Sequence, residues 1–141
     1  MNIESIMTKK VITVNMDITL MVICRIFEKE KFHHLLVMED NILFGVISDR
    51  DVLKALSPFL NTLAEQVRDL LTLKKKAHQI MNRNPITITK EASLENAAQL
   101  MLKNTISCLP VVSPDGHVEG IITWKDLLKV YPRLIEVGIS N

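Results

Sequence analysis

Hydrophobic and polar positions follow one pattern twice along this chain. Each time, a short run of β-branched residues, at 11–14 and again at 86–88, predicts a strand. Apolar residues spaced three and four apart then predict a helix with one buried face, preceded by Thr19 or Ser93 as its N-cap. The apolar residues of this helix are Leu20, Ile23, Cys24 and Phe27 in the first copy and Leu94, Ala97, Ala98 and Met101 in the second.

A pair of strands and a last helix complete each copy. Apolar runs interrupted by turn-forming residues predict two joined strands over 35–47 and again over 109–122. Ser48 and Thr123 then stand where the final helix begins. The order in each copy is strand, helix, strand, strand, helix, which predicts an α+β fold.

The two copies also match residue by residue. Ile-Met-Thr-Lys-Lys-Val-Ile-Thr-Val at 6–14 recurs as Ile-Met-Asn-Arg-Asn-Pro-Ile-Thr-Ile at 80–88. Gly-Val-Ile-Ser-Asp-Arg-Asp-Val-Leu-Lys at 45–54 recurs as Gly-Ile-Ile-Thr-Trp-Lys-Asp-Leu-Leu-Lys at 120–129. The chain is therefore interpreted as a duplication of one unit.

We predict a first repeat over 1–57, a helical linker over 58–77 and a second repeat over 78–141. A repeat of roughly fifty residues buries too little surface to be stable alone, so we expect the two to pack sheet to sheet as a pseudo-twofold pair with clefts between them. In the linker, Ser57-Pro58 suits a helix start. The lysines at 74–76 either end that helix as a solvated charge run or contact an anionic ligand or partner.

Charge and composition argue against several classes of function. The chain has 141 residues, of which 17 are basic and 16 acidic, and its formal net charge is +1. So small a net charge provides no electrostatic attraction to nucleic acid or to an anionic membrane. No apolar run reaches the length of a membrane span, and the N-terminus does not read as a secretory signal, so we expect a cytoplasmic protein. Cys24 and Cys108 are interpreted as buried small side chains without a disulfide or redox role.

The repeated pattern resembles a tandem pair of CBS domains, known as a Bateman module. The matching pieces are the two segments quoted above and the Leu-Pro-Val-Val strand at 109–112, so the resemblance covers nearly the whole chain. It implies a stand-alone regulatory module that binds AMP, ADP, ATP or S-adenosylmethionine and needs no cofactor. It also implies a homodimer formed through helices and an unidentified partner whose activity the module regulates.

Four residues are the principal candidates for ligand binding. Ser48 and Thr123 lie at a helix N-terminus, where a hydroxyl and unpaired N–H groups favour a phosphate. Asp51 and Asp126, three residues later, offer a carboxylate that can accept from both ribose hydroxyls. The resemblance assigns the same roles. Each pair also fits an ordinary capping box, and a cap does not exclude a ligand.

Further candidates surround these four. Arg50 and Lys125 either reach a phosphate or are exposed helix charges. Four apolar residues either line the base or belong to the core: Val11, Ile12, Pro85 and Ile86. Because Trp124 replaces Asp49 in the second copy, the sequence favours the Thr123 and Asp126 site as the stronger one. Trp124 is equally interpreted as a surface aromatic in a dimer interface.

Other functions find little support in the sequence. His33 and His34 are adjacent, so on a strand they point to opposite faces, and no nearby Cys or Asp completes a metal site. No nucleophile–base pair or phosphate-binding loop indicates an enzyme. Two hypotheses remain: an adenine-nucleotide sensor, and a structural interaction module whose clefts are vestigial.

Overall fold

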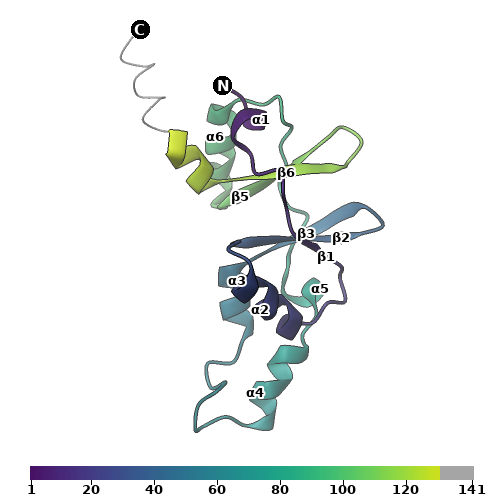
Figure 1. The fold of residues 1–141 in the computed structure, drawn as a ribbon, viewed down its shortest axis with the longest axis vertical. Coiled ribbons are helices and arrows are strands. Elements are labelled where there is room, and N and C mark those ends of the chain that lie inside the picture. Colours follow the sequence, from purple (N-terminus) through teal and green to yellow (C-terminus); the bar gives the residue numbers. More distant parts are fainter. Residues whose placement is uncertain (131–141) are drawn as a thin grey trace. The chain divides into compact units, whose positions relative to one another are not determined.

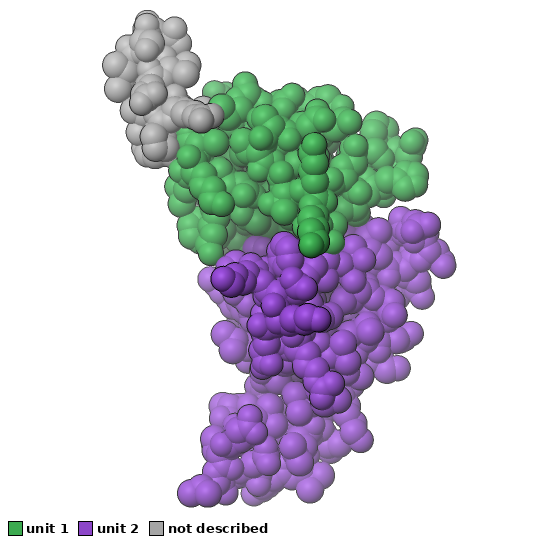
Figure 2. All heavy atoms as spheres, viewed as in Figure 1, with its two compact units in different colours: residues 1–11, 86–141 green, residues 12–85 purple. Residues whose placement is uncertain are grey.

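The structure, a computed structural model, describes residues 1–130 and divides the chain into two compact units (Figures 1 and 2). The described part of unit 1 comprises residues 1–11 and 86–130, coloured green in Figure 2. Unit 2 comprises residues 12–85, coloured purple. Both units combine helices and antiparallel strands, which confirms the predicted α+β class.

Unit 2 contains a four-stranded sheet in the order β1-β2-β3-β4, in which β1 runs parallel to β2 and the other neighbours are antiparallel. The helices α2 and α3 contact each other on one side of this sheet (Figure 1). Its elements are β1 (Thr13–Val14), α2 (Leu20–Lys29), β2 (His34–Glu39), β3 (Ile42–Ser48), α3 (Asp49–Ala55), α4 (Val67–Leu71), η1 (Thr72–Lys74), α5 (Ala77–Ile80) and β4 (Asn82–Arg83).

The core of unit 2 forms where the one-sided helix meets the central strands. Leu20 and Ile23 of α2 are completely buried, as are Leu35, Val37 and Ile47 of β2 and β3. Thr19 is the N-cap of α2, as the sequence predicts, although its side chain makes no capping hydrogen bond. The apolar spacing therefore identified both the helix and its buried face.

Unit 1 repeats this arrangement with fewer strands. Its elements are α1 (Ile3–Ile6), α6 (Leu94–Asn104), β5 (Cys108–Val112) and β6 (Val118–Thr123), and residues 124–130 are also helical. β5 and β6 form an antiparallel pair. The predicted N-cap Ser93 accepts a hydrogen bond from the Asn96 N–H at 3.0 Å. Ile3, Leu109, Val111 and Ile122 are completely buried in its core.

The short helix that begins each repeat packs with the other repeat. In unit 1, the N–H of Ile3 in α1 donates to the carbonyl of Ala92 at 3.1 Å. In unit 2, the N–H of Ala77 in α5 donates to the carbonyl of Ile18 at 2.8 Å. The boundaries of the two repeats, as read from the sequence, stay a prediction. Each compact unit combines segments of both repeats, so the units do not coincide with the repeats.

Three predicted elements are shorter than expected. The strand predicted at 11–14 comprises only Thr13–Val14, and in the run at 86–88 only Ile88 forms a bridge, with Val111. The linker helix predicted from Pro58 begins at Val67. Leu63, on the expected apolar face, is fully exposed, so this stretch has no surface to pack against, and helical spacing alone rarely stabilises a short helix.

Within residues 1–130, no helix is long and apolar enough to cross a membrane.

Two glycines allow the start of one repeat to lie against the strand of the other. A Cβ on Gly45 would lie 2.9 Å from the carbonyl oxygen of Asn82, and one on Gly120 would lie 2.7 Å from that of Thr8. In each unit the segment pairs antiparallel with this strand, through Val46↔Asn82 and Thr8↔Ile121. The space beside each glycine is therefore occupied by the chain's own backbone.

We expect Gly45→Ala and Gly120→Ala each to lower the free energy of unfolding by about 1–3 kcal/mol, because the added methyl must push backbone atoms apart. Urea unfolding of each variant measures this loss. Lys103→Ala, an exposed position on α6, is the control and should change stability by less than about 0.5 kcal/mol. A glycine variant as stable as this control would show that the strand and the neighbouring segment separate at no cost.

Candidate functional site

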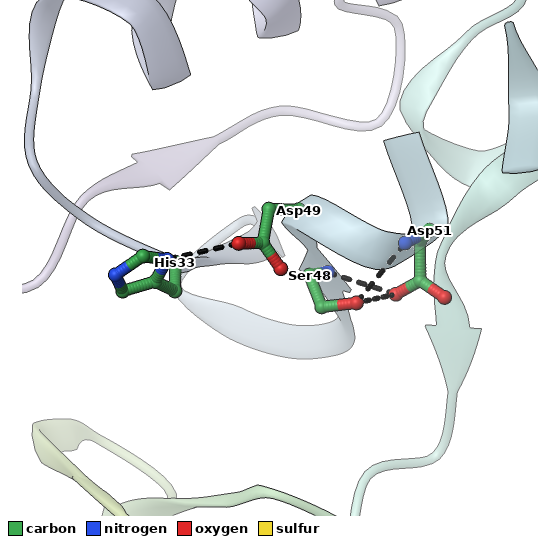
Figure 3. Close-up of polar contacts among 4 residues, drawn as sticks. All are labelled: His33, Ser48, Asp49 and Asp51. Atoms are coloured by element: carbon green, nitrogen blue, oxygen red, sulfur yellow. Dashed lines mark hydrogen bonds and ion pairs between the residues drawn. The ribbon is translucent and has the colours of Figure 1, made fainter. Parts of the chain in front are cut away.

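Ser48 and Asp51 form a reciprocal capping box at the start of α3 (Figure 3). The Asp51 N–H donates to Ser48 Oγ at 3.1 Å. In return, the N–H and the hydroxyl of Ser48 both donate to Asp51 Oδ2, at 2.8 and 2.9 Å. The local sequence alone explains this geometry, since Ser-x-x-Asp satisfies two backbone donors that a helix start leaves unpaired.

Thr123 and Asp126 repeat the same geometry in unit 1. The N–H and the hydroxyl of Thr123 donate to Asp126 Oδ2 at 2.9 and 3.1 Å, and the Asp126 N–H lies 3.4 Å from Thr123 Oγ1. Both residues are half-buried, as are Ser48 and Asp51. Each unit thus places a hydroxyl and a carboxylate together at a helix start, with the hydroxyl hydrogen directed at the carboxylate.

Asp51 accepts a third hydrogen bond that Asp126 lacks among residues 1–130. The side-chain amide of Asn82 in β4 donates to Asp51 Oδ2 at 2.8 Å and lies 3.5 Å from the carbonyl of Val46. Asn82 corresponds in the repeat to Thr8 of unit 1. Sequence reasoning did not single out Asn82, although the Thr-to-Asn difference between the aligned segments was a visible signal.

The apolar candidates divide between the units. Ile12 and Pro85 belong to unit 2 with Ser48, and Val11 and Ile86 belong to unit 1 with Thr123. The sequence neighbours Val11 and Ile12 thus lie in different units, as do Pro85 and Ile86. Ile86 is exposed, whereas the other three are half-buried, so none of the four belongs to the fully buried core. A role in lining a base stays a prediction.

The two basic candidates differ in their surroundings. Arg50 is exposed in the first turn of α3. Lys125 places its ammonium 5.8 Å from the centre of the Trp124 ring, within cation–π distance. Trp124 is 46% exposed, so the pair is reachable from solvent.

An open cavity of about 340 Å³ lies beside α3 in unit 2, and Asp51 is the one sequence-predicted site residue that lines it. Lys54 and Lys75 also line this cavity. Lys75 also donates to the carbonyl of Ala55 at 3.0 Å and thereby caps the end of α3. Lys75 therefore stabilises the end of α3 and not, as predicted for the lysine run, the end of the linker helix. Contact of the lysine run with an anionic ligand or partner stays a prediction.

His33 and Asp49 form an ion pair in unit 2, with His33 Nδ1 2.9 Å from Asp49 Oδ2 (Figure 3). Burial alone would raise the pKa of Asp49. The hydrogen bonds from His33 and from the Arg50 N–H, with the nearby charges of His33 and His34, lower that pKa below its usual value. The sequence alone gave no sign of this contact, because sixteen residues separate the partners.

The described residues contain no group of three or more His, Cys, Asp or Glu side chains that could hold a metal ion.

Comparisons with known proteins agree with this arrangement. The CBS domain pattern matches residues 3–58 and 77–133. A CBS domain-containing protein of Dictyostelium discoideum is 35% identical over 136 residues, which cover 95% of this chain and 93% of that protein.

Two solved structures extend the comparison. CBSX2 in complex with AMP superposes with a TM-score of 0.75 at 26% identity, over 94% of this chain and 97% of that one. The CBS domain pair of protein MJ0100, in complex with 5-methylthioadenosine and S-adenosyl-L-methionine, superposes with a TM-score of 0.76 at 28% identity, over 93% of this chain and 99% of that one.

We expect His33→Ala to raise the pKa of Asp49 towards its usual value, because the variant removes the hydrogen bond and the nearby charge. An Asp with a lowered folded-state pKa stabilises the fold fully above its ordinary value of about 3.9, and this contribution disappears as pH falls through the folded value. Carboxylate NMR titration of Asp49 measures the change. His117→Ala, in unit 1, is the control, and an Asp49 pKa that both variants leave unmoved would contradict the assigned cause.

Proposed function

Because this chain belongs to the CBS domain family, with two copies of the domain in tandem, we propose that it is a regulatory module that binds an adenine nucleotide and signals its presence to a partner protein. AMP, ADP, ATP and S-adenosylmethionine are the ligands to be tested. The observation that carries the proposal is the same hydroxyl–carboxylate pair at a helix start in both units.

The carboxylates suit a ribose. Asp51 and Asp126 both use Oδ2 for the capping box, and no hydrogen bond from residues 1–130 reaches either Oδ1. An ionised carboxylate oxygen offers two lone pairs, so each Oδ1 is able to accept from a sugar hydroxyl. In this proposal Ile12 and Pro85 line the base beside Asp51, and Val11 and Ile86 line it beside Asp126.

The hydroxyls suit a phosphate once they turn. Ser48 Oγ and Thr123 Oγ1 now donate to their carboxylates, and rotation about the side-chain bond redirects that hydrogen to a phosphate oxygen. Arg50 and Lys125 bring positive charge to the same helix starts. The relatives crystallised with AMP and with S-adenosyl-L-methionine support this choice of ligand class.

The second candidate function is a structural module that binds a partner regardless of ligand. Leu53 and Leu128 favour it, since both lie at the same position of the last helix of a repeat and are 73% and 55% exposed. Exposed leucines at matching helix positions suit a helical interface, including one between two copies of the chain. The two functions share the fold and differ in whether ligand binding occurs.

We expect calorimetric titration to show binding of one of the four ligands, and we expect Asp51→Ala or Asp126→Ala to abolish part or all of it, because each removes the ribose acceptor. Asp115→Ala, an exposed aspartate of the turn between β5 and β6, is the matched control and should bind as the wild type does. Thermal melts verify that every variant folds. Well-folded wild-type protein that binds none of the four ligands would leave the structural module as the function.

A further inference from the structure

The two carboxylates proposed to hold ribose are not equivalent. Asp51 Oδ2 accepts from the N–H of Ser48, the hydroxyl of Ser48 and the amide of Asn82, all within 2.9 Å. Asp126 Oδ2 accepts only from the N–H and hydroxyl of Thr123 among residues 1–130. An oxygen has two lone pairs, so both Oδ2 atoms are filled while the hydroxyls donate to them. Once the hydroxyl turns to a phosphate, as proposed above, Asp51 Oδ2 still accepts from the Ser48 N–H and from Asn82. Asp126 Oδ2 then accepts only from the Thr123 N–H and has one lone pair open.

The backbone holds Asn82 in place. Its main chain pairs with Val46 in the β3–β4 ladder, and its side-chain amide spans from the Val46 carbonyl to Asp51. The amide therefore donates where a ribose hydroxyl would donate. A ligand that engages Oδ2 must first displace it.

The equivalent position in unit 1 leaves the carboxylate open. Thr8 pairs with Ile121 through two backbone hydrogen bonds of 2.9 Å, as Asn82 pairs on its own strand. Its side chain is shorter than that of Asn, and no hydrogen bond joins it to Asp126 in the described part of the chain. The backbone contact is thus common to both units, and the additional donor is specific to unit 2.

We propose that Asn82 is a specificity-determining residue that occupies the carboxylate of Asp51 and thereby directs adenine ribonucleotides to Asp126. The inference rests on the proposed function and concerns the ribose alone. At Asp51 one sugar hydroxyl reaches Oδ1, whereas at Asp126 two hydroxyls reach the carboxylate. The site in unit 1 therefore binds AMP more tightly and distinguishes it more strongly from 2′-deoxy-AMP.

The experiment introduces Asn82→Thr or Thr8→Asn into a protein in which the aspartate of the other site is replaced by alanine, so that only one site binds ligand. In an Asp126→Ala background, which leaves the Asp51 site, adding Asn82→Thr should tighten AMP binding roughly tenfold, because a second sugar hydroxyl can then donate to the charged carboxylate. In an Asp51→Ala background, which leaves the Asp126 site, adding Thr8→Asn should weaken AMP binding by a similar factor. Calorimetry with AMP and 2′-deoxy-AMP measures all four proteins, and thermal melts verify folding.

The outcomes separate this inference from the proposed function. AMP binding that neither exchange alters overturns the role of Asn82 and leaves the nucleotide module intact. Tighter binding at Asp51 than at Asp126 in the two silenced backgrounds also overturns it. No binding of AMP, ADP, ATP or S-adenosylmethionine by the wild-type protein, together with no AMP binding by any variant, with all of them folded, overturns both. Should Asn82→Thr fail to fold, the Thr8→Asn arm decides the question, because it adds a donor to a unit whose own strand pairing is unchanged.

Discussion

The close approach of a repeat's first segment to the last strand of the other repeat is the constraint on which each unit depends. Gly45 and Gly120 leave no room for a side chain because backbone oxygens of Asn82 and Thr8 already occupy that space. The same contact continues into backbone pairing of the segment with the strand. It therefore places α5 in the core of unit 2 and α1 in the core of unit 1. A larger residue at either glycine would push the first segment of the other repeat away from the strand. It would thereby also displace the short helix of that segment and the helix start that follows the strand.

The atoms proposed to bind a ligand also stabilise the helix starts. The hydroxyl and carboxylate at each helix start satisfy backbone donors that would otherwise be unpaired. A ligand that binds these groups can use only the hydrogen-bond donors and acceptors that the capping box leaves free. One carboxylate oxygen and a rotatable hydroxyl remain in each unit. The helix start is therefore already formed without ligand, which reduces the ordering cost of binding.

Duplication has allowed the two copies to diverge around an unchanged geometry. Unit 2 has the His33–Asp49 ion pair at its helix start, and unit 1 has Trp124 at the position of Asp49. Unit 2 has the amide of Asn82 on its carboxylate, and unit 1 has Thr8 in its place. A carboxylate repels a phosphate, whereas an indole with a nearby ammonium does not. Under the proposed function, both differences favour stronger nucleotide binding in unit 1.

The sequence by itself determined the features that depend on neighbouring residues. Apolar spacing identified α2 and α6 with their buried faces, and Ser93, Ser48 and Thr123 marked helix starts, because caps and helical periodicity act within one turn. Tertiary structure alone decided which strand edge each repeat start pairs with, and hence that Asn82 meets Asp51 from thirty-one residues away. It also decided that the apolar stretch after Pro58 lacks a helix until Val67, since a helical pattern persists only where a surface exists to bury it.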